Sequence, residues 1–149
     1  MSETAVLYKV LEVKEQEKQE AQLERVKAVE KFEHIANQLY EQLKEKEDAE
    51  EHLNVEMKAT FTIDKMINQT QYINILANKI INLQFHVQQA RNKMETAQDQ
   101  LNEAHIEVKK IEKMIEIRED ALEAEARTVE ATMMDEMSIK QYNKQIQNG

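Results

Sequence analysis

The second half of the chain carries an unbroken repeat of seven residues. Ten successive positions spaced by seven, from Met66 to Val129, are all apolar. Six successive positions three residues further on, from Leu76 to Ile111, are apolar as well. This spacing is typical of a coiled coil, because it keeps one face of a helix against a partner helix. The first series is Met66, Ile73, Ile80, Val87, Met94, Leu101, Val108, Ile115, Leu122 and Val129.

The first half repeats the pattern more weakly. One series of the repeat reads Phe32, Leu39, Lys46 and Leu53, and the other reads Val29, Ala36, Leu43, Glu50 and Met57. Between Lys14 and Gln22 the predicted seam is almost wholly polar, so we expect this part to be loosely held.

The two repeats are out of step where they meet. Met66 follows Met57 by nine positions, and the segment between them includes Thr62, a residue type that favours the position just before a helix. Asp64 would follow near the positive end of the new helix. We place a turn at about residues 59–62. The alternative is one uninterrupted helix that dimerises across an irregularity in the repeat.

These features predict an all-α fold, a long antiparallel two-helix coiled-coil hairpin that forms a single domain over residues 1–149. The helices are expected at about residues 4–58 and 63–142. Facing residues in such a hairpin would have numbers that add up to about 121, so Leu7 would lie near Met114. The second helix would therefore have no partner in the hairpin beyond about Arg118.

Composition supports this fold and opposes several functions. The chain has no Pro, Cys or Trp and one Gly, which is Gly149, so turns are rare. The net charge of −9 opposes nucleic-acid binding, and no apolar run is long enough to span a membrane. The first 13 residues do not resemble a signal peptide.

The residues needed for most catalytic chemistry are missing from the sequence. A phosphate-binding loop needs internal glycines, and a thiol nucleophile needs cysteine. The four histidines are widely spaced, and the acidic pairs are typical of solvated helix faces. We therefore expect no enzymatic activity, no cofactor and no bound metal.

One segment has almost no charge. From Met66 to Ala90 the one full charge is Lys79, in a protein of which 33% is charged. Apolar residues here also lie away from the coiled-coil face, so the helix has more to bury than one partner can cover. This predicts a docking surface for another protein, with a third helix or self-association as the alternative. The residues off the seam are Ile67, Ile75, Ile81 and Phe85, with Tyr72 at its edge.

Five stretches, taken in order, resemble one known family. The chain is similar to the FliJ family, coiled-coil components of the flagellar type III export apparatus. The stretches are Leu7–Lys14, Phe32-x-x-Ile35-Ala36-x-x-Leu39, Gln71-Tyr72-Ile73-x-x-Leu76-x-x-x-Ile80, the run from Leu101 to Lys113, and the acidic pair Asp135-Glu136.

The resemblance implies a stalk-like protein whose terminal end inserts into the hexameric export ATPase and promotes its assembly. The tip-side half would reach the export gate, a membrane protein, and the chain would also escort export chaperones. It would work in the cytoplasm at the inner face of the cell membrane. A stalk of a virulence type III secretion system, or a generic coiled-coil scaffold, is the alternative.

The same resemblance assigns partner contacts to two groups of residues. The export gate would contact Gln71, Tyr72, Leu76, Ile67, Ile75, Ile81 and Phe85. The ATPase ring would contact Leu7, Leu11, Leu122, Val129 and Met133.

Overall fold

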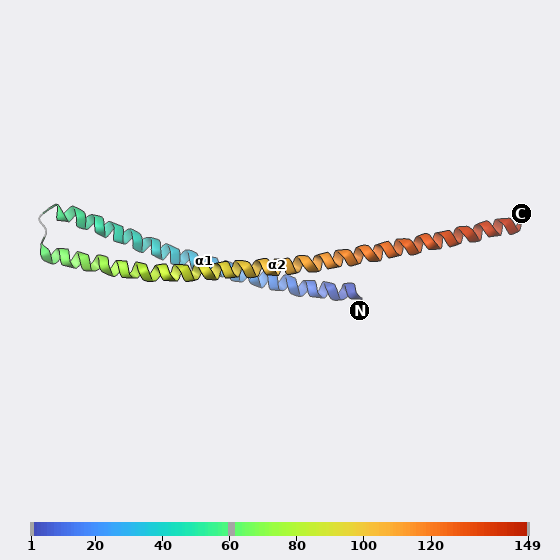
Figure 1. Cartoon of the computed structure of the whole chain (residues 1–149), viewed down its shortest axis with the longest axis horizontal. Helices are drawn as coiled ribbons and strands as arrows, with labels where there is room; N and C mark the ends of the chain where they lie inside the picture. The colour runs from blue at the N-terminus through green and yellow to red at the C-terminus, as the bar shows by residue number, and fades with distance from the viewer. Residues whose placement is uncertain (1, 60–61, 149) are drawn as a thin grey trace. The chain divides into compact units, whose positions relative to one another are not determined.

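The chain folds into two α-helices, α1 (Glu3–Met57) and α2 (Ile63–Asn148), which are joined by a short connection (Figure 1). This is a computed structural model, and it describes residues 2–59 and 62–148. Its contacts fall into two compact units: the tip unit, Gln19–Glu103, and the terminal unit, Met1–Lys18 with Ala104–Gly149. The predicted all-α helical hairpin is confirmed.

In the tip unit, the predicted stripe of α2 is the face that packs against α1. Leu76, Ile80, Ala90 and Ala97 are buried, and Leu76 is only 2% exposed. Every other position of the predicted repeat between Met66 and Leu101 is half-buried. Alternating steps of three and four residues keep this stripe on one side of the helix, so the repeat itself determines which side is covered.

The α1 stripe differs from the prediction in one of its two series. Phe32, Leu39, Lys46 and Leu53 are half-buried as predicted, and so are Val29 and Ala36 of the other series, but its later members Leu43, Glu50 and Met57 are exposed. A further half-buried series lies one residue earlier, at Ala28, Ile35, Gln42, Ala49 and Glu56.

The correction has a physical reason. Glu56, one residue before the exposed Met57, accepts a hydrogen bond of 3.2 Å from Nε2 of Gln69 on α2. The large apolar residues of α2 supply most of the buried surface, so α1 can cover them with small or long polar side chains. Apolarity alone therefore identified Val29 and Ala36 but missed the covered Gln42 and Glu56.

Polar contacts across the tip unit fix the register of the two helices. Arg25 donates from Nε to the side-chain oxygen of Gln98. The guanidinium of Arg91 lies 5.8 Å from the centre of the Phe32 ring, a cation–π distance. Residue numbers rise along one helix as they fall along the other, so the helices are antiparallel.

Both helices begin with a side-chain cap. Lys65 N–H donates to Oγ1 of Thr62 at 3.4 Å, which confirms the predicted cap of α2. At the start of α1, Ala5 N–H donates to Oγ of Ser2 at 3.2 Å. Helix α1 ends at Met57, and residues 60 and 61 of the predicted turn lie outside the described residues.

In the terminal unit, α1 covers only the beginning of the α2 segment. Val108 and Ile115 of α2 are buried, while Leu7, Val10 and Leu11 of α1 are half-buried. After Ile115, every described residue of α2 is exposed as far as Asn148.

We expect Leu76→Ala to lower the free energy of unfolding by about 2–5 kcal/mol, because it leaves a cavity in the seam. Ile81→Ala removes an exposed side chain from the same helix and should change that free energy by less than about 1 kcal/mol. Urea unfolding followed by circular dichroism measures both variants. Equal effects of the two substitutions would contradict the burial of Leu76.

Candidate partner-binding surfaces

The tip unit carries an uncharged apolar surface on α2, facing away from α1. We call Ile67, Gln71, Ile75, Ile81 and Phe85 the tip surface, and all five are exposed. At about 100° per residue, Ile67, Ile81 and Phe85 lie within about 40° of one another around the helix, with Ile75 to one side. Phe85 is 60% exposed, which is unusual for a large aromatic side chain with no function in binding.

Tyr72 lies at the edge of the seam rather than on the tip surface. Its hydroxyl donates to the carboxylate of Glu45 on α1 at 3.4 Å. Partial desolvation, followed by the charge and the hydrogen bond of Glu45, raises the pKa of Tyr72 above its ordinary value. Tyr72 also lines a groove of about 460 Å³ beside His52 and Gln69.

Leu76 is not available to a partner, contrary to the prediction that grouped it with the gate contacts. It is the most buried side chain of the seam. It belongs to the apolar stripe that holds the hairpin together, and a stripe residue cannot face α1 and a partner at the same time. It therefore contributes to the packing of the helix that carries the tip surface.

The terminal unit carries the second predicted surface. Leu122, Val129 and Met133 are each at least half exposed, and Leu122 and Val129 continue the α2 repeat past the end of its contact with α1. Leu7 and Leu11, which were predicted with them, are half-buried between the helices. The structure therefore separates this predicted group into an exposed set on α2 and a covered set on α1.

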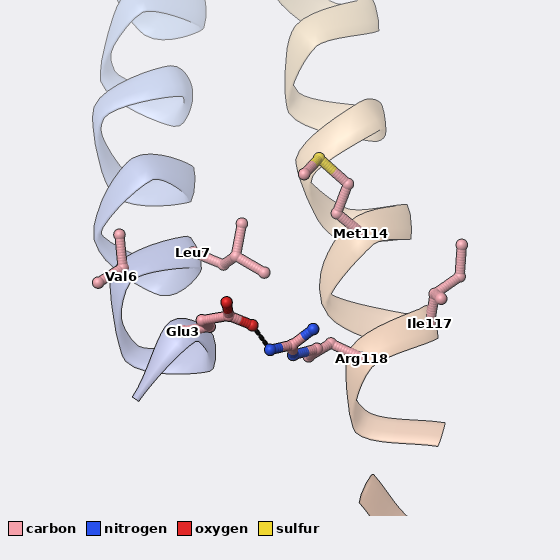
Figure 2. A pocket seen from close by; sticks show the side chains of 6 residues that line it. All are labelled: Glu3, Val6, Leu7, Met114, Ile117 and Arg118. Atoms are coloured by element: carbon pink, nitrogen blue, oxygen red, sulfur yellow. Dashed lines mark ion pairs between the residues drawn. The ribbon is translucent and has the colours of Figure 1, made fainter. Parts of the chain in front are cut away.

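A groove that the sequence reasoning missed lies where α1 begins (Figure 2). Its volume is about 540 Å³, and Figure 2 shows Leu7 pointing toward α2. Glu3 and Arg118 form an ion pair across its open end. The sequence predicts that the numbers of facing residues add up to about 121. This rule could have identified the ion pair, because it places the oppositely charged Glu3 and Arg118 opposite each other. The lining residues are Glu3, Val6, Leu7, Met114, Ile117 and Arg118.

A second polar contact ties the start of α1 to α2. The Tyr8 hydroxyl donates to the carboxylate of Glu119. This hydrogen bond raises the pKa of Tyr8 above its ordinary value of 10.0, with smaller contributions from desolvation and from the charge of Glu119. Together with the ion pair of Glu3, it fixes the point at which α2 leaves α1.

Within residues 2–59 and 62–148, no group of three or more His, Asp or Glu side chains is arranged to hold a metal ion. No described helix combines the length and the hydropathy that crossing a bilayer requires.

Comparison with known proteins decides the family. The family model described as "Flagellar FliJ protein" matches residues 3–147. This chain belongs to the FliJ family. The predicted resemblance is thereby confirmed, and it covers both surfaces described above.

A curated relative agrees with this assignment. The flagellar FliJ protein of Bacillus subtilis (strain 168) is 37% identical over 134 residues, which cover 90% of this chain and 91% of the relative. No solved structure gives a significant match to the chain. FliJ proteins are structural components rather than a family of enzymes, and membership supports a role connected with flagellar export.

The contact between Tyr8 and Glu119 gives a pH-dependent prediction. A raised pKa in the folded state means that the contact stabilises the fold below the ordinary pKa and is lost as pH rises through the folded value. Glu119→Gln should therefore move the Tyr8 pKa down toward its ordinary value. Carbon-13 NMR of labelled tyrosine rings, assigned with Tyr8→Phe, measures the shift, and an unchanged Tyr8 titration in Glu119→Gln would refute the contact.

Proposed function

We propose that this chain is a non-enzymatic stalk of the flagellar type III protein export apparatus. In this proposal the unpaired part of α2 enters the hexameric export ATPase and promotes its assembly. The tip surface contacts the cytoplasmic part of the export gate, and the chain also escorts export chaperones. It would therefore act in the cytoplasm, at the inner face of the cell membrane.

The observation that carries the proposal is the apolar repeat of α2, which continues after its contact with α1 has ended. Leu122 and Val129 stand at positions that, earlier in the helix, are buried against α1. An apolar stripe with no partner in its own chain is typical of a surface that another protein covers. A central stalk inside a protein ring needs such a helix, because the ring must grip side chains on its surface.

The tip surface supports a second partner. Its residues lie in the segment between Met66 and Ala90, where Lys79 is the one full charge. Interface cores are depleted of charged residues and enriched in aromatic ones, as this face is with Phe85. The FliJ family match, together with two separate apolar surfaces, favours a link between two components over a scaffold with an evenly charged surface.

The terminal surface can be tested with paired substitutions. Leu122→Lys combined with Met133→Lys should reduce stimulation of the purified export ATPase at least about tenfold, because each lysine would have to be desolvated in the complex. The control combines Ala124→Lys with Ala131→Lys, which puts the same charges on the opposite face of α2. Equal loss of stimulation in both variants would show that the apolar face is not the contact.

The tip surface gives an independent prediction. Ile81→Ser combined with Phe85→Ser should weaken binding to the cytoplasmic part of the export gate by about tenfold or more, because both apolar contacts are lost. Val55→Ser removes an exposed apolar residue from α1 and should leave binding unchanged. Calorimetry measures the affinity and circular dichroism checks helicity. Normal gate binding by the double variant would refute this part of the proposal.

A further inference from the structure

The start of α1 covers one end of an apolar stripe that continues along α2 without cover. In the terminal unit, four successive members of one series of the α2 repeat form this stripe. The first two are buried and the last two are exposed; in order they are Val108, Ile115, Leu122 and Val129. We call residues 3–18, the α1 part of the terminal unit, the strap. The strap therefore decides how much of the stripe another molecule can reach.

A polar stretch separates the apolar contact of the strap from the rest of the α1 seam. The large apolar residues that the strap places in the seam are half-buried, and they are Leu7, Val10 and Leu11. The half-buried positions that follow along α1 are Lys14, Lys18, Ala21 and Arg25. Large apolar residues return to the seam at Val29. Lys14 pairs with Glu17 of its own helix at 3.4 Å, a contact that does not hold α1 to α2.

The strap is also weakly attached at its own end. The ion pair of Glu3 and the hydrogen bond of Tyr8 to α2 both lie among exposed groups, and exposed pairs contribute little to stability because water competes for them. The groove of about 540 Å³ lies between Leu7 of the strap and Met114 of α2, so the two helices are not closely packed here (Figure 2). Side chains that line unfilled space lose part of their dispersion contacts.

We propose that the strap is a releasable cover, which detaches from α2 as one unit while the tip unit stays folded. The break falls in the polar stretch, before the contact of Arg25 with Gln98 that belongs to the tip unit. An isolated helix as short as the strap is only marginally stable in water, so the strap loses its helical structure when it detaches. Release exposes Val108 and Ile115.

Release of the strap has a consequence for binding, and this consequence rests on the proposed function. If the ATPase grips Leu122 and Val129, an open strap adds Val108 and Ile115 to the same continuous contact. The closed strap then limits binding as an autoinhibitory contact, and binding shifts the strap toward its open state. The opening itself is a property of this chain alone and does not depend on the ATPase.

Thiol labelling measures the opening directly, because the chain has no cysteine of its own. Val108→Cys places a thiol under the strap, at a position that is 3% exposed, and Ile80→Cys places one in the tip unit, at a position that is 6% exposed. The thiol of Val108→Cys should react at least about tenfold faster, because a buried thiol reacts only when its cover opens. Equal rates in two variants that circular dichroism shows to be folded would overturn the proposal.

A substitution in the polar stretch distinguishes release as a unit from fraying of the helix end. Lys18→Leu adds an apolar side chain to the seam, so it should slow the labelling of Val108→Cys at least about tenfold, because more apolar surface must be uncovered on opening. Gln19→Leu adds the same side chain at an exposed position and should leave the rate unchanged. Fraying that stops before residue 18 would not be affected by Lys18→Leu, so an unchanged rate in that variant would overturn release as a unit.

A covalent lock tests the autoinhibition. Leu7→Cys combined with Met114→Cys places two thiols in the groove, one on each helix (Figure 2). A short bifunctional maleimide links them and holds the strap closed, and a monofunctional maleimide on the same variant is the matched control. The linked chain should need at least about tenfold more protein for half-maximal stimulation of the export ATPase, because its open state is no longer populated.

The outcomes separate this inference from the proposed function. Equal stimulation by the linked chain and its control would overturn the autoinhibition and leave the proposed function standing. A wild-type chain that does not stimulate the ATPase would overturn the proposed function and the autoinhibition together. The labelling rates involve no ATPase, so they decide in either case whether the strap opens.

Discussion

The burial of one apolar stripe of α2 against α1 is the interaction on which the rest of the structure depends. All the buried residues among those described, such as Leu76 and Val108, belong to α2, and no residue of α1 is buried. The chain has too few large apolar residues for a second core, with charged residues making up 33% of its composition. Most side chains off this seam are therefore exposed, and both candidate binding surfaces follow from that constraint.

The unequal lengths of the helices have a second consequence. Helix α1 has 55 residues and α2 has 86, so an antiparallel hairpin leaves part of α2 without an internal partner. The Glu3–Arg118 ion pair and the Tyr8–Glu119 hydrogen bond stand at the point where this contact ends. The repeat continues past that point through Leu122 and Val129. A stripe that is structural in one part of the helix thereby becomes available for binding in the next.

Most of the fold could be predicted because the α2 repeat is long and almost entirely apolar. The stripe from Met66 to Ile115, the cap at Thr62 and the FliJ family all agree with the sequence reasoning. The α1 register was partly wrong because its covered series includes Gln42 and Glu56, which apolarity does not identify. Leu76 was grouped with the partner contacts because the sequence shows an uncharged segment but not which of its faces α1 covers. The groove beside Glu3 depends on a pairing of distant residues, which no local pattern reveals but which the predicted sum of facing residue numbers allows.

The central claim is that this chain connects with the flagellar export ATPase through its unpaired helix. The most direct test measures ATP hydrolysis by the purified export ATPase of the same organism with and without the wild-type chain, together with size-exclusion analysis of ring formation. We expect faster hydrolysis and a larger ATPase species that contains this chain. An unchanged rate with no co-elution would contradict the stalk function and leave the helical hairpin with a different partner.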